Sequence, residues 1–159
     1  MLNPVNRNLI KGLGLLFLVV AGVAWSIARK PAPAAMDLTW HQGAVVSPKE
    51  VELEGRALVF GVAGLAKAFR HDADAPAYDT LKVELVKGAA IRVRYDPAQE
   101  GRWTRAWSVQ RNGSPLLTYV QMKAWDDDKK SFGFVLAIVM GVLGLALTVL
   151  GFRAKRKEA

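Results

Sequence analysis

The chain has 159 residues, a formal net charge of +8, 52% hydrophobic residues and no cysteine. The lack of cysteine excludes disulfides, cysteine-based zinc sites, iron–sulfur clusters and thiol catalysis. Residues 31–130 contain 14 basic and 13 acidic side chains, so seven of the eight excess charges flank two apolar runs. The charge pattern therefore favours a membrane protein and argues against a nucleic-acid partner, which would need a concentrated basic field.

Residues 12–28 and 131–152 form the two apolar runs, and neither contains a charged side chain. A helix rises 1.5 Å per residue, so about 20 residues are needed to cross roughly 30 Å of hydrocarbon. The second run is long enough by itself, whereas the first reaches this length with Leu9, Ile10 and a snorkelling Lys11. We predict that both runs are transmembrane helices and that the first is an uncleaved signal-anchor.

A cleaved signal peptide is the alternative interpretation of the first run. Arg7 and Lys11 form a basic start, and the Ala-Pro-Ala sequence at residues 32–34 resembles a cleavage site. However, the run is longer than the usual ~7–15 apolar residues, and Arg29 and Lys30 separate it from that site. These two details favour a retained helix.

The positive-inside bias gives an expected orientation. The tails at residues 1–11 and 153–159 carry six Lys and Arg residues. The ends of the two helices next to the central domain carry five. We therefore expect both tails to be cytoplasmic. A linker at residues 29–36 would lead to an extracytoplasmic domain at residues 37–125, and a juxtamembrane segment at residues 126–130 would lead back to the membrane.

Two hairpins are predicted within this domain. Residues 80–86 and 90–95 alternate apolar and charged side chains on either side of a Lys-Gly turn. The second hairpin forms around Asn112-Gly113, because Asn-Gly is the strongest short hairpin signal. Its strands are expected at residues 107–111 and 114–122.

A two-residue loop would set the register of the second hairpin. Arg111 would pair with Ser114, Val109 with Leu116, and Trp107 with Thr118. The last two pairs are expected on the core face of the sheet.

The earlier part of the domain has weaker signals. Residues 37–41, 43–47 and 51–60 are rich in β-branched and aromatic side chains, which favours strands. Residues 62–71 space their apolar side chains at helical intervals and are followed by helix-stopping residues at 72–76. The expected fold is two transmembrane α-helices flanking a β-rich α+β domain, with about five to seven antiparallel strands and one short helix.

The end of one predicted strand carries a resemblance to a known family. Gly88 begins a stretch that ends in Tyr95-Asp96-Pro97, with an apolar helix about thirty residues further on. This arrangement resembles a bacterial family of small two-span membrane proteins whose β-rich extracytoplasmic domain has no assigned function. Residues 98–101 differ from the second proline-containing turn of that family. The resemblance implies a location in the bacterial inner membrane with a periplasmic or extracellular domain, and it supplies no catalytic residues.

Arg102, Trp103 and Arg105 interleave cations with an indole, a composition found at protein interaction hot spots. They are the candidate partner-binding residues, with an ordinary loop as the alternative. In the second apolar run, small residues recur every four positions and permit close helix packing. This stripe could pack within the chain or between two copies, and its residues are Gly133, Ala137 and Gly141.

His71, Asp72 and Asp74, together with His41, could bind a divalent metal through imidazole and carboxylate groups. The two aspartates could equally end the preceding helix and solvate the turn. No Gly-x-Ser-x-Gly elbow, phosphate-binding glycine loop or His-Glu-x-x-His motif is present. We therefore expect no catalytic residues, no bound metal and no cofactor.

The expected function is a membrane-anchored extracytoplasmic module for protein interaction or accessory roles, such as an assembly factor or an immunity-type protein. One alternative is an envelope metal-dependent hydrolase that uses the His71 to Asp74 cluster. Another is a structural membrane protein that self-associates through its second helix. The expected partners are the lipid bilayer and a protein of unknown identity.

Overall fold

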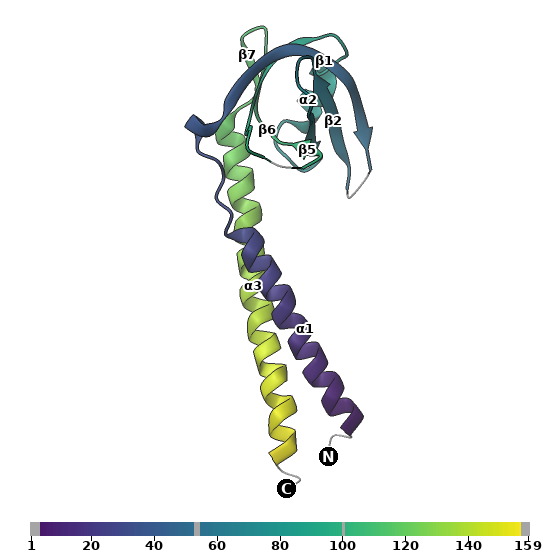
Figure 1. Cartoon of the computed structure of the whole chain (residues 1–159), viewed down its shortest axis with the longest axis vertical. Helices are drawn as coiled ribbons and strands as arrows, with labels where there is room; N and C mark the ends of the chain where they lie inside the picture. The colour runs from purple at the N-terminus through teal and green to yellow at the C-terminus, as the bar shows by residue number, and fades with distance from the viewer. Residues whose placement is uncertain (1–3, 53–54, 100, 157–159) are drawn as a thin grey trace. The chain divides into compact units, whose positions relative to one another are not determined.

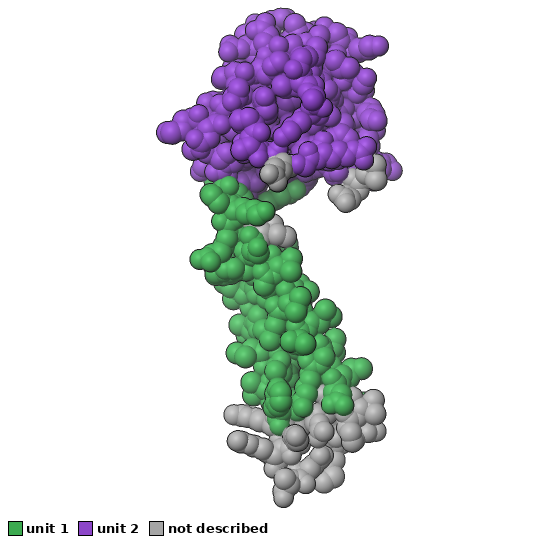
Figure 2. All heavy atoms as spheres, viewed as in Figure 1, with its two compact units in different colours: residues 1–31, 127–159 green, residues 32–126 purple. Residues whose placement is uncertain are grey.

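The computed structural model describes residues 4–52, 55–99 and 101–156. The chain divides into two compact units, coloured separately in Figure 2. The helical unit comprises residues 1–31 and 127–159, and the sheet domain comprises residues 32–126. The outer ends of the two predicted basic tails, residues 1–3 and 157–159, lie outside the described residues.

Two long helices supply the helical unit. Helix α1 runs from Pro4–Ala28 and helix α3 from Tyr119–Arg156. Both contain a segment long and apolar enough to cross a membrane, Asn8–Ser26 in α1 and Tyr119–Phe152 in α3. The prediction of two such helices is confirmed, although α3 begins well before the predicted start at residue 131.

The start of α3 is fixed by a capping box. The Thr118 hydroxyl accepts a hydrogen bond from the Gln121 backbone N–H at 3.3 Å, and the Gln121 side chain accepts one from the Thr118 N–H at 3.0 Å. This reciprocal Thr-x-x-Gln pairing satisfies two N–H groups that have no partner inside the helix. The prediction of a strand through residues 114–122 is therefore wrong beyond Leu117, where the strand ends.

Helices α1 and α3 approach most closely at two glycines. A Cβ placed on Gly144 would lie 2.9 Å from the Gly14 carbonyl oxygen, and one placed on Gly14 would lie 2.9 Å from the Thr148 backbone nitrogen. Neither distance is available to a real side chain, so both positions require glycine for this approach. Such close backbone contact is how helices pack where burial of apolar surface from water provides no driving force.

The sheet domain contains seven strands in the order β5-β3-β2-β1-β4-β6-β7. Neighbouring strands are antiparallel except for β3 and β5, which are parallel. Seven strands fall within the expected range, but the expectation of a wholly antiparallel sheet is wrong at this pair. The strands are β1 Thr39–Val51, β2 Ala57–Val62, β3 Ala68–Asp72, β4 Ala90–Tyr95, β5 Trp103–Thr104, β6 Ala106–Arg111 and β7 Ser114–Leu117.

The sheet closes on itself because β5 and β6 are separated by Arg105 alone. One of these strands pairs with β3 and the other with β4, so a single stretch of chain joins both halves of the sheet. Helix α2, Tyr78–Glu84, lies in the chain between β3 and β4. The two halves of the sheet therefore form a partly open barrel, with α2 in the connection between them.

Strand β1 spans both halves of the barrel and bends across the domain in Figure 1. Its first half pairs with β4 and its second half with β2. The register shifts between Val46 and Lys49, and Ser47 adopts a left-handed φ of 48° at this point. The separate strands predicted at residues 37–41 and 43–47 are thus one continuous strand, preceded by a short 3-10 turn at Ala35–Asp37.

The predicted strand at residues 80–86 is wrong, because most of this segment forms α2. Leu81 and Leu85 are fully buried, whereas Val83 is 70% exposed. Positions four apart lie on the same face of a helix, so Leu81 in α2 and Leu85 directly after its last residue are both buried, and Val83 is left in solvent. The two leucines would be buried in a strand as well as in the helix, whereas the valine would be buried only in a strand.

The predicted helix at residues 62–71 is also wrong. Gly64 has a φ of +88°, a conformation that a helix interior does not permit, and it separates β2 from β3. Phe69 and His71 in β3 are buried, while Arg70 between them is partly exposed. This alternation is the period-two pattern of a strand with one face in the core.

The Asn112-Gly113 hairpin is confirmed, with Arg111 opposite Ser114 as predicted. A register shift between Val109 and Gln110 places Val109 opposite Leu117 in place of Leu116. Trp107 does not pair with Thr118, because β7 ends at Leu117. Trp107 and Val109 are nevertheless buried in the core, as the prediction required.

Substitutions on α2 distinguish the helix from the predicted strand. Leu81→Ala is expected to lower the free energy of unfolding by about 2–5 kcal/mol, because it leaves a cavity in the core. Val83→Ala is expected to change it by no more than about 0.5 kcal/mol. Denaturant unfolding of the full chain in detergent micelles measures both, and equal losses in the two variants would support a strand.

A disulfide tests the pairing of α1 with α3. A Cβ placed on Gly141 would lie 3.8 Å from the Cβ of Ala21, which suits a disulfide. In this cysteine-free chain, Ala21→Cys combined with Gly141→Cys should form an intramolecular bridge on oxidation. The control combines Ala21→Cys with Val139→Cys, which is exposed two residues away on α3. Mass spectrometry should show loss of two hydrogens in the first variant only, and covalent dimers of the first variant would contradict this pairing.

Candidate functional site

The predicted partner-binding residue Arg105 is occupied inside the sheet domain. Its guanidinium donates a hydrogen bond to the Asp126 carboxylate at 2.6 Å, and Asp126 is only 7% exposed. The same guanidinium lies 5.6 Å from the ring centroid of Trp107 and 5.2 Å from that of Trp125. Arg105 therefore joins the β5–β6 break to the first turns of α3, which is a structural role.

Arg102 and Trp103 lie at the surface of the domain. Arg102 is exposed, and its guanidinium lies 4.9 Å from the ring centroid of Trp103. Trp103 is half-buried on β5 and pairs with Ala68 on β3. The structure therefore divides the predicted set, because two members are available to a partner and Arg105 serves the fold.

The small-residue stripe of α3 faces α1 within the chain. Cβ atoms placed on Gly133 and Gly141 would each lie 3.8 Å from an alanine Cβ of α1, and Ala137 between them is buried. These distances correspond to ordinary van der Waals contact. The stripe thus serves intramolecular packing in this structure.

The proposed metal-binding residues point to other partners. The buried His71 imidazole donates from Nε2 to the Pro76 carbonyl at 2.9 Å, and the Asp72 carboxylate forms an ion pair with Arg70 at 2.9 Å. His41 contacts the Ala63 carbonyl through its Nε2 at 2.8 Å. Within residues 4–52, 55–99 and 101–156, no three His, Asp or Glu side chains are grouped so that they could hold a metal ion.

Among the described residues of the sheet domain, Glu50 is the acid whose pKa is clearly shifted. Hydrogen bonds from the Tyr78 hydroxyl at 2.7 Å, from Lys82 and from Arg56 lower its pKa from 4.5 to about 2. These groups come from β1, α2 and the segment before β2, so the carboxylate ties the helix to one end of the barrel. The perturbation has a structural explanation and does not by itself mark a catalytic acid.

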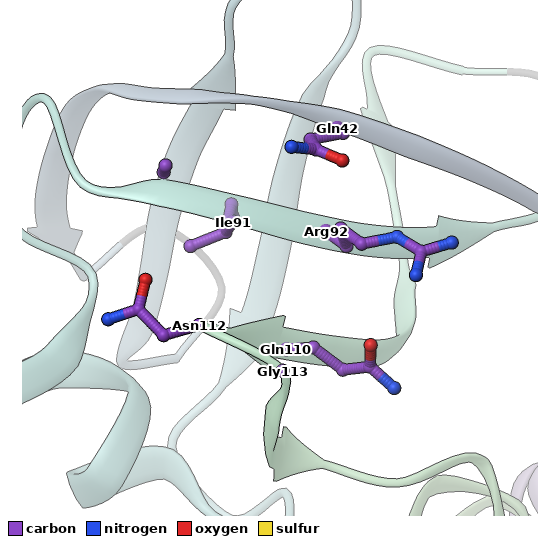
Figure 3. A pocket seen from close by; sticks show the side chains of 7 residues that line it. Gln42, Ile91, Arg92, Gln110, Asn112 and Gly113 are labelled. Atoms are coloured by element: carbon purple, nitrogen blue, oxygen red, sulfur yellow. The ribbon is translucent and has the colours of Figure 1, made fainter.

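A shallow pocket of about 140 Å³ lies on the outer face of β1, β4 and β6. Gln42 pairs with Arg92, and Arg92 pairs with Gln110 on the next strand. Directly opposite residues share a face of a sheet, so their side chains form one row across three strands (Figure 3). We call this the donor pocket; it is lined by Gln42, Ala90, Ile91, Arg92, Gln110, Asn112 and Gly113.

Trp40 flanks this row on the same face of the sheet. The guanidinium groups of Arg92 and Arg94 lie 5.0 and 5.5 Å from its ring centroid. Arg94 also donates to the Ala35 carbonyl oxygen, so it is anchored to the segment before β1. Arg92 has no such anchor among the described residues, and its side chain is exposed beside the donor pocket.

Sequence reasoning did not identify the donor pocket. The sequence predicts a strand with alternating charged side chains at residues 90–95, but it pairs this strand with residues 80–86 in place of β1 and β6. The period-two pattern of residues 90–95 gives the exposed face, and only the strand order brings Gln42 and Gln110 beside Arg92.

No protein-family model matches the chain, and no match to a curated protein or a solved structure was found.

The buried His71 should make stability depend on pH. Burial, and to a smaller extent Arg105, lowers its pKa below the usual 6.5, against the opposing effects of the Pro76 carbonyl, Asp72 and Asp74. Below about pH 6.5 the unfolded chain therefore binds a proton that the folded chain resists, so stability falls as the pH decreases towards the lowered folded pKa. The slope contributed by one histidine is at most about 1.4 kcal/mol per pH unit.

The matched variant for this experiment is His71→Gln, whose amide can still donate to the Pro76 carbonyl but does not titrate. Denaturant unfolding between pH 7 and about 5.5 should show a smaller loss of stability for the variant than for the native chain. Equal slopes would show that His71 takes up its proton as readily in the folded protein as in the unfolded one.

Proposed function

We propose that the chain is a two-pass protein of a bacterial cytoplasmic membrane, with both termini in the cytoplasm and the sheet domain outside. In this proposal the domain is a protein-interaction module that an accessory or assembly factor would need. The barrel fold does not assign an activity, because one fold can carry many functions. The proposal therefore rests on surfaces and on individual side chains.

The supporting observation for the membrane is the apolar surface of α1 and α3. Leu15 in α1 and Val142 in α3 are each 64% exposed, and Phe132 is 71% exposed. Soluble monomers rarely expose contiguous apolar patches of more than a few hundred Å². Lipid chains would cover these side chains, and the helices satisfy their backbone hydrogen bonds internally, as a bilayer requires.

A binding role is favoured over catalysis by how the ionisable groups are used. The perturbed groups His71 and Glu50 each hold elements of the fold together through the contacts described above. The outer face of β1, β4 and β6 instead carries polar side chains beside a tryptophan, which suits recognition. The sheet domain has 12 basic and 11 acidic residues, so its near-neutral charge supports a protein partner over nucleic acid.

The sidedness rests on the basic tails and can be tested by labelling. Ser114→Cys places a single thiol at the exposed start of β7, next to the Asn112-Gly113 turn. If the domain is outside, a membrane-impermeant maleimide should label this variant in intact spheroplasts. The measurement is the labelled fraction before and after lysis.

Ala159→Cys is the matched control, since it places the thiol in the predicted cytoplasmic tail. It should be labelled only after lysis. The opposite pattern in the two variants would place the domain in the cytoplasm, and recovery of the native chain in the soluble fraction after lysis would overturn the membrane assignment itself.

A further inference from the structure

We propose that the donor pocket binds the carboxylate of an aspartate or glutamate in an acidic segment of the partner protein. This inference rests on the proposed interaction function and names the chemistry of its partner. Four of the seven lining residues carry side-chain hydrogen-bond donors, the other three are Ala90, Ile91 and Gly113, and none of the seven is acidic. The row of Gln42, Arg92 and Gln110 is its centre (Figure 3).

The charge of Arg92 is not neutralised inside the domain. Other arginines of the sheet domain form ion pairs with carboxylates, and these are Arg56, Arg70, Arg105 and Arg111. Among the residues that the structure describes, no carboxylate forms an ion pair with Arg92, which contacts the Trp40 ring. An arginine that is exposed and stacked, but not paired, retains its fork of N–H donors for an external carboxylate.

The carboxamides around Arg92 add neutral donors. Gln42, Gln110 and Asn112 each carry an NH₂ group, and none of the three amides forms a side-chain hydrogen bond within the described residues. A guanidinium surrounded by amide donors, with no acidic side chain in the pocket lining, is complementary to a carboxylate. Charge-assisted hydrogen bonds of this kind are about twice as strong as neutral ones.

The pocket is partly preorganised. The Trp40 ring holds the Arg92 guanidinium at 5.0 Å, which limits the side-chain entropy that binding would remove. Asn112 and Gly113 both have positive φ angles, 51° and 81°, as a tight two-residue hairpin loop requires. The wall that they form is therefore fixed by the turn.

The size of the pocket suits a single side chain. Its volume of about 140 Å³ is several times that of one water in the liquid, about 30 Å³, so a glutamate side chain can enter it and displace water. The partner's backbone would lie across the sheet face, where Trp40 provides apolar contact.

The test uses the full chain in detergent micelles and two capped tripeptides, Gly-Glu-Gly and Gly-Gln-Gly. NMR titration of the Gly113 backbone amide reports binding at the pocket. The glutamate peptide should bind at least about tenfold more tightly than the glutamine peptide, which corresponds to about 1.4 kcal/mol. Arg92→Gln should weaken binding of the glutamate peptide by a similar factor.

Lys49→Gln is the control, because Lys49 is also an exposed cation of the sheet domain but does not line the pocket. It should leave the titration unchanged, and the amide spectrum away from the pocket confirms that each variant is folded. Equal binding of the two peptides, or equal weakening by the two variants, would overturn the proposal. Inorganic phosphate that binds more tightly than the glutamate peptide would overturn it in favour of a general oxyanion site.

The result is separable from the proposed function. If the glutamate peptide does not bind but the thiol at residue 114 is labelled from outside, the proposal of an acidic partner is wrong. The proposal of a membrane-anchored interaction module would then still stand. Successful titration with inverted labelling would retain the carboxylate pocket and place its partner in the cytoplasm.

Discussion

The sheet domain depends on one strand serving two halves of a barrel. Strand β1 pairs with β4 before the register shift and with β2 after it, and Ser47 takes a left-handed conformation at the point of change. Because this irregularity turns the strand, the apolar faces of both halves meet in one core. The polar outer face around Gln42 is the other side of the same strand, so the geometry that builds the core also exposes the row beside Arg92.

The two units meet their requirement for apolar contact in different ways. The sheet domain buries its own large side chains, with Phe60, Phe69 and Leu81 fully inaccessible. Helices α1 and α3 leave most of theirs exposed and approach each other through Gly14 and Gly144. A core in water is formed by large apolar residues, whereas close backbone contact stabilises packed helices in a bilayer, which is the location that we propose for α1 and α3. Packing thus explains Gly14 and Gly144, where a Cβ would collide with the facing helix.

The sequence predicted those features whose signal is local. The two apolar runs and the Asn112-Gly113 turn depend on neighbouring residues, and the structure confirms two long apolar helices and the turn. The capping box of Thr118 and Gln121 is equally local, and it could have placed the start of α3 correctly. The segment containing Leu81, Val83 and Leu85 could not be resolved this way, because apolar residues at i, i+2 and i+4 satisfy a strand completely and a helix at its first and last positions. The choice between helix and strand depends on which of these side chains pack against the rest of the core.

The availability of the predicted binding residues also depends on contacts between distant parts of the chain. Arg102, Trp103 and Arg105 share one local composition, yet the chain brings Asp126 to Arg105 alone, and that contact spans 21 positions. Arg92 is the opposite case, because the fold brings the uncharged amides of Gln42 and Gln110 to it from other strands and no carboxylate among the described residues. Whether an arginine is available to a ligand is therefore decided by the carboxylates that the fold places near it. The sequence shows where the arginines are, but only the strand order shows which of them lies near a carboxylate and which can bind a partner.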